Sequence, residues 1–266
     1  MELIRLKKGE YLNINHPIVA TIGQFDGLHL AHLLLLKKTI ELSQKRNLKS
    51  AIFTFDPHPD FILNKDKTNT YVTPFDEKVK LLREIGIDYM IVIEFNKEVA
   101  QMLPISFVEN ILIANGVKEV VVGFDFSFGQ KGLGKAHMIE ELSKGRIKCH
   151  IVDEMKHENQ KIGTSFIKTL LQNGRVREVK DLMGRFYKIT GKVVHGNQVG
   201  RTINFPTANF SINSSFAKLH PGVYVVRVSI DDKKLPILVL IQVSIKLTIW
   251  FLKHIFLILI KIFMIK

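Results

Sequence analysis

A glycine-flanked turn between a short apolar run and a helical pattern constrains the fold of this chain more than any other segment. Gly23 and Gly27 bracket the turn, and the periodicity predicts a helix over Leu33–Gln44. The start of a helix offers free N–H groups and a partial positive charge, which suit a phosphate. His29 and His32 are three residues apart there and can face the same anion. The segment therefore indicates phosphate chemistry at the first strand-to-helix turn of an α/β sheet.

Two other interpretations of the histidine pair stay open. Nearby histidines are often only polar surface in an α/β domain, and ligands three or four residues apart can begin a zinc site. No cysteine cluster and no third histidine lies close by in the sequence, which disfavours zinc.

The alternation of apolar runs with amphipathic segments extends from residue 18 to about residue 153. It predicts a mainly parallel, doubly wound sheet, because short β-branched strands that alternate with helices need crossover connections. The predicted strands are Pro17–Ile22, Ser50–Phe55, Tyr89–Glu94, Glu119–Gly123 and Ile147–Val152, and the predicted helices are Leu33–Gln44, Phe75–Ile85, Ser106–Ala114 and Ala136–Lys144.

Three motifs follow predicted strands of this sheet. They are Gly23–His32, Thr54–Pro59 and Gly123–Gly129, the last of which places Asp125 among aromatic residues. Ligands of doubly wound sheets bind beyond the carboxyl ends of the strands. The three motifs are therefore expected to meet at one edge.

The second half of the chain has a different pattern of predicted elements. Helices are predicted over Ser165–Asn173 and Val176–Met183, and strands follow over Tyr187–His195, Thr202–Phe210 and Gly222–Ile230 with no helix between them. Strands separated by Gly, Asn and Pro turns indicate a small β-barrel.

Composition excludes several classes of protein. Cys149 is the only cysteine of 266 residues, so no disulfide can form within the chain, and a cytoplasmic protein is expected. The formal net charge is +13, but the basic residues are scattered and not interleaved with aromatics, so no nucleic-acid partner is expected. The N-terminal residues do not read as a signal peptide.

Five segments taken together resemble the bacterial bifunctional riboflavin kinase/FAD synthetase family. They are GQFDGLHLAH at 23–32, TFDPHP at 54–59, VVGFDFSFG at 121–129, GTSFIK at 163–168 and the PTAN sequence at 206–209. The resemblance implies a Rossmann-like nucleotidyltransferase domain over 1–183 and a partial riboflavin kinase barrel over 184–235. Residues 236–266 form an aberrant hydrophobic and lysine-rich tail, so the expected barrel is an incomplete one.

The family implies two reactions: riboflavin and ATP give FMN, and FMN and ATP then give FAD and pyrophosphate. Mg²⁺ is the implied metal, and ATP, FMN and riboflavin are the implied substrates. By the same resemblance, the catalytic residues are His29, His32 and Lys168, and the ATP or phosphate contacts are Gly23, Phe25, Asp26, Gly27, Asp125, Thr164 and Ser165. The resemblance assigns ATP and Mg²⁺ in the kinase half to Gly191, His195, Gly196, Thr207 and Asn209, with Thr207 and Asn209 holding the metal.

Two substitutions depart from the family pattern in the first domain. Ala31 stands where the family has glycine, and its methyl group is expected to crowd the phosphate, with strain if its φ is positive. Lys168 replaces an arginine and loses a bidentate phosphate contact. Both changes predict weakened adenylyl transfer.

The third departure is the tail, where the resemblance is expected to end after about Leu235. Residues 236–266 contain no Asp, Glu or Gly. We favour an altered reading frame as the origin of this composition. The alternatives are a membrane helix over Leu247–Ile265, disfavoured because Lys253 and His254 fall near its middle, and buried barrel strands.

The composition of the tail also bears on the kinase reaction. The family's kinase base is a glutamate on a later strand, and no carboxylate follows Asp232 here. Riboflavin phosphorylation is therefore expected to be lost or impaired, and the barrel to have open edges. The alternatives are another nucleotidyltransferase, which the PTAN sequence argues against, and a decayed paralogue that at most binds flavin or nucleotide.

Overall fold

The computed structural model describes residues 1–7, 9–12, 16–66, 68–194, 207–230, 233–243, 247–250 and 259–264. The chain forms two compact units, and each is described by itself. Unit 1 comprises Met1–Asn69 and Phe75–Lys161, and unit 2 comprises Thr70–Pro74 and Ile162–Lys266. The domain boundaries expected from the sequence follow the family motifs and stay a prediction.

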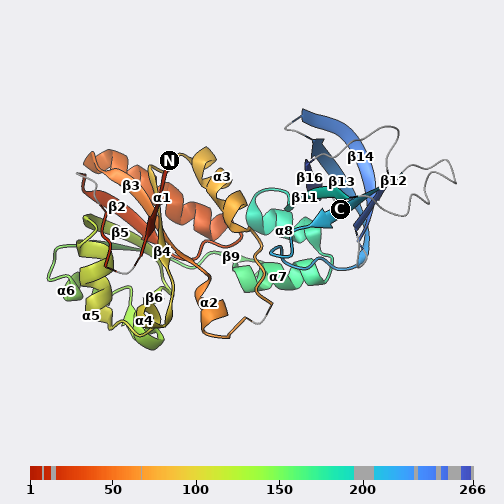
Figure 1. Ribbon diagram of the computed structural model, residues 1–266. Coiled ribbons are helices and arrows are strands. Elements are labelled where there is room, and N and C mark those ends of the chain that lie inside the picture. The colour runs from red at the N-terminus through yellow and green to blue at the C-terminus, as the bar shows by residue number, and fades with distance from the viewer. Residues whose placement is uncertain are drawn as a thin grey trace. The chain divides into compact units, whose positions relative to one another are not determined.

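A six-stranded parallel sheet forms the centre of unit 1 (Figure 1). Its order is β1-β4-β3-β2-β5-β8, and every neighbouring pair runs parallel. The strands are β1 (Glu2–Leu6), β2 (Ile18–Ile22), β3 (Lys49–Asp56), β4 (Tyr89–Glu94), β5 (Val117–Gly123) and β8 (Lys148–Val152). The predicted doubly wound fold is confirmed, and β1 is a strand that the sequence pattern did not predict.

The order of strands reverses between β2 and β5. From β2 the chain adds β3 and then β4 on one side, and it returns to add β5 and β8 on the other. A doubly wound sheet binds its ligands at such a switch point, beyond the carboxyl ends of the strands. The loops that follow β2 and β5 therefore occupy the expected ligand-binding edge.

Helices cover both faces of the sheet and enclose two separate cores. On one face α1 (Leu30–Arg46) and α3 (Phe75–Ile85) pack Leu36, Val79 and Leu82 against Ile52 and Met90. These contacts remove large aliphatic side chains from water, which is the dominant favourable term in folding.

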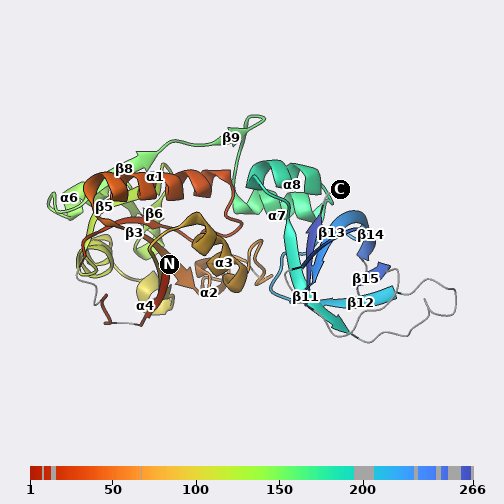
Figure 2. The same cartoon turned by 90° about the horizontal axis from the view of Figure 1, so that it is seen from above.

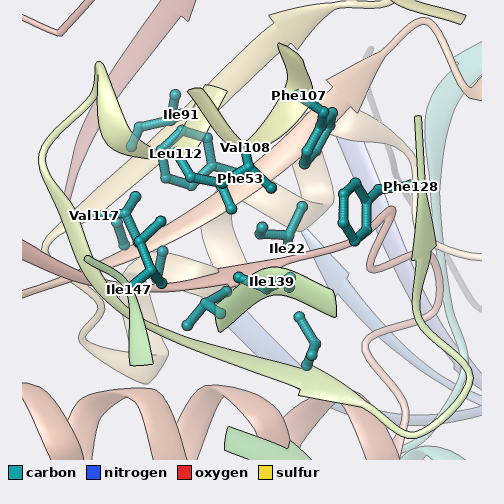
Figure 3. Packing of buried hydrophobic residues seen from close by; sticks show 14 of the residues in the cluster. Ile22, Phe53, Ile91, Phe107, Val108, Leu112, Val117, Phe128, Ile139 and Ile147 are labelled. Atoms are coloured by element: carbon teal, nitrogen blue, oxygen red, sulfur yellow. The ribbon is translucent and has the colours of Figure 1, made fainter. Parts of the chain in front are cut away.

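The second core lies on the opposite face of the sheet (Figure 3). Phe107 of α5 (Pro104–Phe107) and Val108 and Leu112 of the π-helix η1 (Val108–Ile113) meet Phe53 and Ile91 there. The sequence predicts one regular helix over Ser106–Ala114, whereas the structure has a short α-helix that widens into a π-helix. The remaining helix of this face is α6 (Met138–Leu142).

Several short elements lie in the segments that connect the main helices and strands of unit 1. The helical turns are α2 (Pro59–Ile62), α4 (Lys97–Ala100) and η2 (Gln130–Gly132), and the two-stranded ribbons pair β6 (Ser127–Phe128) with β7 (Gly134–Lys135) and β9 (Lys156–His157) with β10 (Gln160–Lys161).

Unit 2 combines two helices with a closed antiparallel barrel (Figure 2). The helices are α7 (Thr164–Gln172) and α8 (Val176–Met183), which pack on one another. The barrel order is β11-β12-β15-β14-β13-β16. Its strands are β11 (Lys188–Val194), β12 (Thr207–Ile212), β13 (Gly222–Ile230), β14 (Lys233–Val243), β15 (Leu247–Trp250) and β16 (Leu259–Met264).

Strands from the tail close the barrel. The last of them, β16, pairs with both β11 and β13 and so joins its two ends. The expectation of open edges is therefore wrong for the described strands. The composition of the tail explains the difference, because runs rich in β-branched Ile and Val that lack Gly fit a pleated sheet. The alternative of a membrane helix over 247–265 is also wrong where the structure describes it, since β15 and β16 are strands.

A five-residue strap, Thr70–Pro74, belongs to unit 2 although the chain on either side of it belongs to unit 1. Tyr71 donates its N–H to the carbonyl of Ser215 at 2.7 Å, and its own carbonyl accepts from Ala217 at 2.7 Å. These two bonds place the strap beside a loop that precedes β13.

Candidate functional site

The loop 23–29, which joins β2 to α1, has an unusual backbone. Phe25 and Leu28 have φ values of 52° and 40°, and Gly27 has a φ of 83°. Residues with a side chain rarely adopt this left-handed region, so the surrounding structure must hold the loop in place. Phe25 and Leu28 are 1% exposed, and their burial in the core under α1 supplies part of that hold.

The two histidines occupy the first turn of α1. His29 is the N-cap residue, and its Nδ1 accepts a hydrogen bond from the backbone N–H of His32 at 3.4 Å. The two imidazole rings stack with centroids 3.6 Å apart, and the ring of Phe25 lies 4.8 Å from that of His32. The structure therefore brings the predicted pair together at a helix N-terminus, beside the switch point of the sheet.

Gly23 and Asp26, two further candidate residues, belong to the loop 23–29 itself. Gly23 donates its N–H to the carbonyl of Phe53 at 3.0 Å, and Asp26 is 1% exposed. The side-chain oxygen Oε1 of Gln24 is buried and has no hydrogen-bond partner within the described residues. This oxygen is thus an unsatisfied polar atom enclosed at the same loop.

Ala31 lies inside α1 and not in the strained turn. It is the second residue of the helix, and its φ is not among the positive values of the chain. The strain that a positive φ would cause is therefore absent at Ala31. The expectation that its methyl group weakens adenylyl transfer stays a prediction.

The side chain of Lys78 in α3 contacts the loop 23–29, and this residue was not among those predicted from the sequence. Its side chain is 2% exposed, its Nζ donates to the backbone carbonyl of Gln24 at 2.7 Å, and the same Nζ lies 3.5 Å from Thr54 Oγ1. Burial lowers the pKa of Lys78 to about 8, against the opposing effect of the carboxylates of Asp26 and Asp56. A signal was present in the sequence: Lys78 is three residues after Phe75 and four before Leu82, on the apolar stripe of the helix.

A pocket of about 900 Å³ opens at the same edge of the sheet. It is formed by the ends of β3 and β4 and by the segment that follows β5, and five phenylalanines and three lysines line it. These are Phe55, Phe95, Phe107, Phe126 and Phe128, with Lys65, Lys97 and Lys131. An aromatic pocket with several cationic side chains suits a planar ligand that carries negative charge.

The aromatic rings of the pocket pack on one another. Phe107 and Phe128 have centroids 5.1 Å apart, Phe126 and Phe128 5.7 Å, and Phe55 and Phe95 5.6 Å (Figure 3 shows Phe107 beside Phe128). A Cβ at Gly129, whose φ is 70°, would come within 3.1 Å of the backbone of Met102 and Pro104. Glycine is therefore needed where this wall of the pocket turns.

Asp125 is exposed and forms an ion pair with Lys161 of β10. The Nζ of Lys161 also lies 5.1 Å from the centroid of the Phe124 ring. The predicted nucleotide contact is thus covered by a lysine of the β9–β10 ribbon, while Phe126 and Phe128 of the same motif line the pocket.

The GTSFIK segment starts α7, in unit 2. Gly163 is the N-cap and offers no side chain, Thr164 begins the helix, and Ser165 is exposed. Lys168 donates from Nζ to the backbone carbonyl of Thr70, in the strap, at 2.6 Å. The structure therefore places these three candidates together in one helix, and it ties Lys168 to the strap.

The kinase candidates lie in the barrel as far as the structure describes them. Gly191 in β11 pairs with Ile212 of β12 and Ile260 of β16. Thr207 and Asn209 are on β12, where the structure describes their backbone pairing only. His195 and Gly196 lie outside the described residues.

Among the described residues, no cluster of three or more His, Cys, Asp or Glu side chains is arranged to hold a metal ion. None of the described helices combines the length and the apolar character that crossing a membrane requires.

The fold and the site of unit 1 define a class of protein: a Rossmann-like nucleotide-binding domain with a helix N-terminus at its switch point and an aromatic ligand pocket. Comparison with known proteins narrows this class. Residues 12–166 match the family model described as FAD synthetase, and residues 183–254 match the one described as riboflavin kinase. The second match continues past residue 235, where we expected the resemblance to end.

Curated relatives carry the same pair of domains. The chain is 36% identical over 225 residues to the bifunctional riboflavin kinase/FMN adenylyltransferase of Listeria monocytogenes, covering 84% of this chain and 71% of that protein. It is 35% identical over 216 residues to the Bacillus subtilis protein of that name, covering 81% and 68%. The chain belongs to the bifunctional riboflavin kinase/FMN adenylyltransferase family.

A solved structure extends the likeness to the whole chain. It is titled as a macrolide-efflux protein from Streptococcus pneumoniae, with a TM-score of 0.89 and 25% identity, and it covers 99% of this chain and 90% of that one. The described strands β14, β15 and β16 show that the C-terminal region of this chain is β-rich where the structure describes it.

Proposed function

We propose that this protein transfers AMP from ATP to FMN, giving FAD and pyrophosphate, and that its riboflavin kinase activity is lost or severely reduced. Family membership and the curated relatives support the first part. The observation that carries it is the aromatic, lysine-lined pocket at the ligand-binding edge of the sheet, because FMN is a planar ring system with a phosphate.

In this reaction a phosphate oxygen of FMN attacks the α-phosphorus of ATP, and the bond to pyrophosphate breaks. The nucleophile is already an anion, so positioning and neutralisation of charge account for most of the catalysis. We propose that His29, His32 and the N-terminal amides of α1 contact the ATP phosphates. Thr164, Ser165 and Lys168 stabilise the pyrophosphate, with Lys168 supplying the charge.

The isoalloxazine ring of FMN is assigned to the phenylalanine pocket. The phenylalanine rings of the pocket already pack on one another with centroids 5–6 Å apart. A flavin ring can therefore stack on them while the pocket keeps its shape. The three lysines then compensate the charge of the phosphate. Asp125 is proposed to contact the nucleotide once Lys161 moves away.

The riboflavin kinase half keeps part of the implied site for ATP and Mg²⁺, but it lacks the glutamate that the resemblance implies as the base. Thr207 and Asn209 carry oxygen atoms of the kind that Mg²⁺ accepts, and the metal would neutralise the phosphates of ATP. No carboxylate follows Asp232, so no side chain of the later strands can accept the proton of the riboflavin 5′-hydroxyl. The closed barrel is compatible with binding of ATP or flavin without phosphoryl transfer.

The test is a chromatographic assay of purified protein with Mg-ATP, given FMN in one reaction and riboflavin in another. We expect FAD from FMN and no FMN from riboflavin. Robust FMN formation from riboflavin would overturn the proposed loss of the kinase. No FAD from FMN, with a native circular dichroism spectrum and with quenching of FMN fluorescence, would favour a paralogue that binds flavin without catalysis.

A further inference from the structure

Lys78 is a buried cation that the proposed chemistry leaves without a role. It lies on α3, with its side chain 2% exposed, while Lys80 on the same helix is half-exposed and pairs with Glu77. Burial of a lysine is costly because the charged amine loses its hydration. The contacts of Lys78 must therefore offset this cost.

The contacts of Lys78 converge on one atom of the loop 23–29. The carbonyl oxygen of Gln24 accepts from Lys78 Nζ at 2.7 Å and from Thr54 Oγ1 at 3.2 Å. Thr54 belongs to β3, so a strand and a helix hold the loop together from two sides. Gln24 is directly followed by Phe25, which has the left-handed backbone described above.

The charges around Lys78 favour its protonated form. Asp26 faces it from the loop and Asp56 from the end of β3, and Asp56 is in turn paired with Arg5 of β1 at 2.9 Å. Both carboxylates therefore attract the protonated amine and oppose the effect of its burial. Loss of the proton removes the attraction to both carboxylates.

We propose that Lys78 is a positioning residue for adenylyl transfer: it fixes the loop 23–29 through the Gln24 carbonyl and so holds the first turn of α1, with His29 and His32, in its working geometry. The inference rests on the proposed function for its catalytic consequence. It does not require that Lys78 touch a substrate. A shift of about 1 Å in the histidines is enough to lower the rate of the chemical step.

The first test is structural and independent of activity. Hydrogen exchange of the backbone amides of residues 23–32 is measured for Lys78→Met, with Lys80→Met as the matched control on the same helix. We expect faster exchange in that segment for Lys78→Met alone. Equal protection in Lys78→Met and in the wild type would overturn the proposal, whether or not the wild type makes FAD.

The second test uses FAD formation, and the wild type is assayed first so that failure of the proposed function is seen separately. We expect Lys78→Met to lower kcat at least about tenfold with KM for ATP and FMN changed by less than about threefold, since the binding pockets remain. Lys80→Met should behave as the wild type. A kcat of Lys78→Met within twofold of the wild type would contradict the positioning role.

A pH profile separates this role from simple support of the fold. The wild-type kcat should fall as the pH rises through about 8, the pKa of Lys78, because the neutral amine no longer attracts Asp26 and Asp56. In Lys78→Arg the guanidinium stays protonated, so the decline should move to higher pH. The same decline in Lys78→Arg and Lys78→Met as in the wild type would count against the proposal. If Lys78→Met does not fold, the Lys78→Arg profile alone decides.

Discussion

At the scale of single residues, the capping role of His29 can be separated from its proposed contact with phosphate. Its ring accepts the N–H of His32 as a helix cap, and it stacks on the ring of His32. Capping needs only a short polar side chain, whereas contact with phosphate in the proposed reaction needs the imidazole. Two substitutions of the same residue distinguish the roles.

His29→Asn should keep the cap and lose the imidazole, while His29→Ala should lose both. We expect both variants to lose FAD formation by about a hundredfold or more. The unfolding free energy should fall by about 1 kcal/mol in His29→Ala and much less in His29→Asn. Thermal melts and FAD assays of the two proteins check this. Near-normal activity of His29→Asn would show that His29 serves only as a cap.

The sequence predicted that His29 and His32 lie together at a helix start, because local signals define such a start. Their contact with phosphate stays a prediction. The sequence could not predict the role of Lys78, whose partners Gln24 and Thr54 lie 54 and 24 residues away. A lysine on an amphipathic helix usually reaches solvent, so the place of Lys78 on the apolar stripe of α3 indicates burial but not the atoms that it contacts.

At the scale of elements, periodicity predicted several segments with their bounds, but it placed the ends of α1, the longest helix described, two to three residues too far inside. The bounds of α3, α8, β4 and β13 agree with the predicted ones, and those of β2 agree to one residue. The edge strand β1 was missed because its pairing with β4 is a long-range choice. The ribbons β6–β7 and β9–β10 are two-residue strands, too short for any periodic signal.

The phenylalanine pocket is also a product of several elements. Its rings come from β3, from the segments after β4 and β5, and from α5, which lie up to 73 residues apart. Each ring alone is an ordinary apolar residue in the sequence. Only the parallel order of the strands brings their carboxyl ends, and so the rings, to one place.

Phe126→Ala tests the pocket, because Phe126 lines it and is only partly buried. We expect the KM for FMN to rise about tenfold, equivalent to about 1.4 kcal/mol of lost stacking, while the KM for ATP changes little. Tyr11→Ala is the control, since Tyr11 is 51% exposed and does not line the pocket. Equal effects on the two substrates would place the flavin elsewhere.

At the scale of the whole molecule, the tail determines whether unit 2 is a closed barrel. The described strand β16 bridges β11 and β13, and Ile262 pairs with Ile189 on one side and Val228 on the other. A residue in this position needs its backbone N–H, because both neighbouring strands use the ladder.

Ile262→Pro removes that N–H and should open the barrel, because each backbone group left without its ladder partner costs about 1–3 kcal/mol. Ile262→Val, which keeps the backbone, is the control. We expect hydrogen exchange to accelerate across β11, β13 and β16 in the proline variant, while the sheet of unit 1 stays protected. Unchanged exchange in these strands would mean that β16 does not close the barrel in solution.

Because the strap 70–74 belongs to unit 2, the two units are not two consecutive segments of the chain. The chain crosses between units at residues 69–70, 74–75 and 161–162, so no single cut releases either one. A gene fragment that starts at residue 162 encodes a barrel without the segment that bonds to Ser215 and Ala217 and receives Lys168. A fragment that stops at residue 161 carries that segment without its partners. Each unit is therefore expected to need the rest of the chain, and the two halves expressed separately should give two incomplete domains.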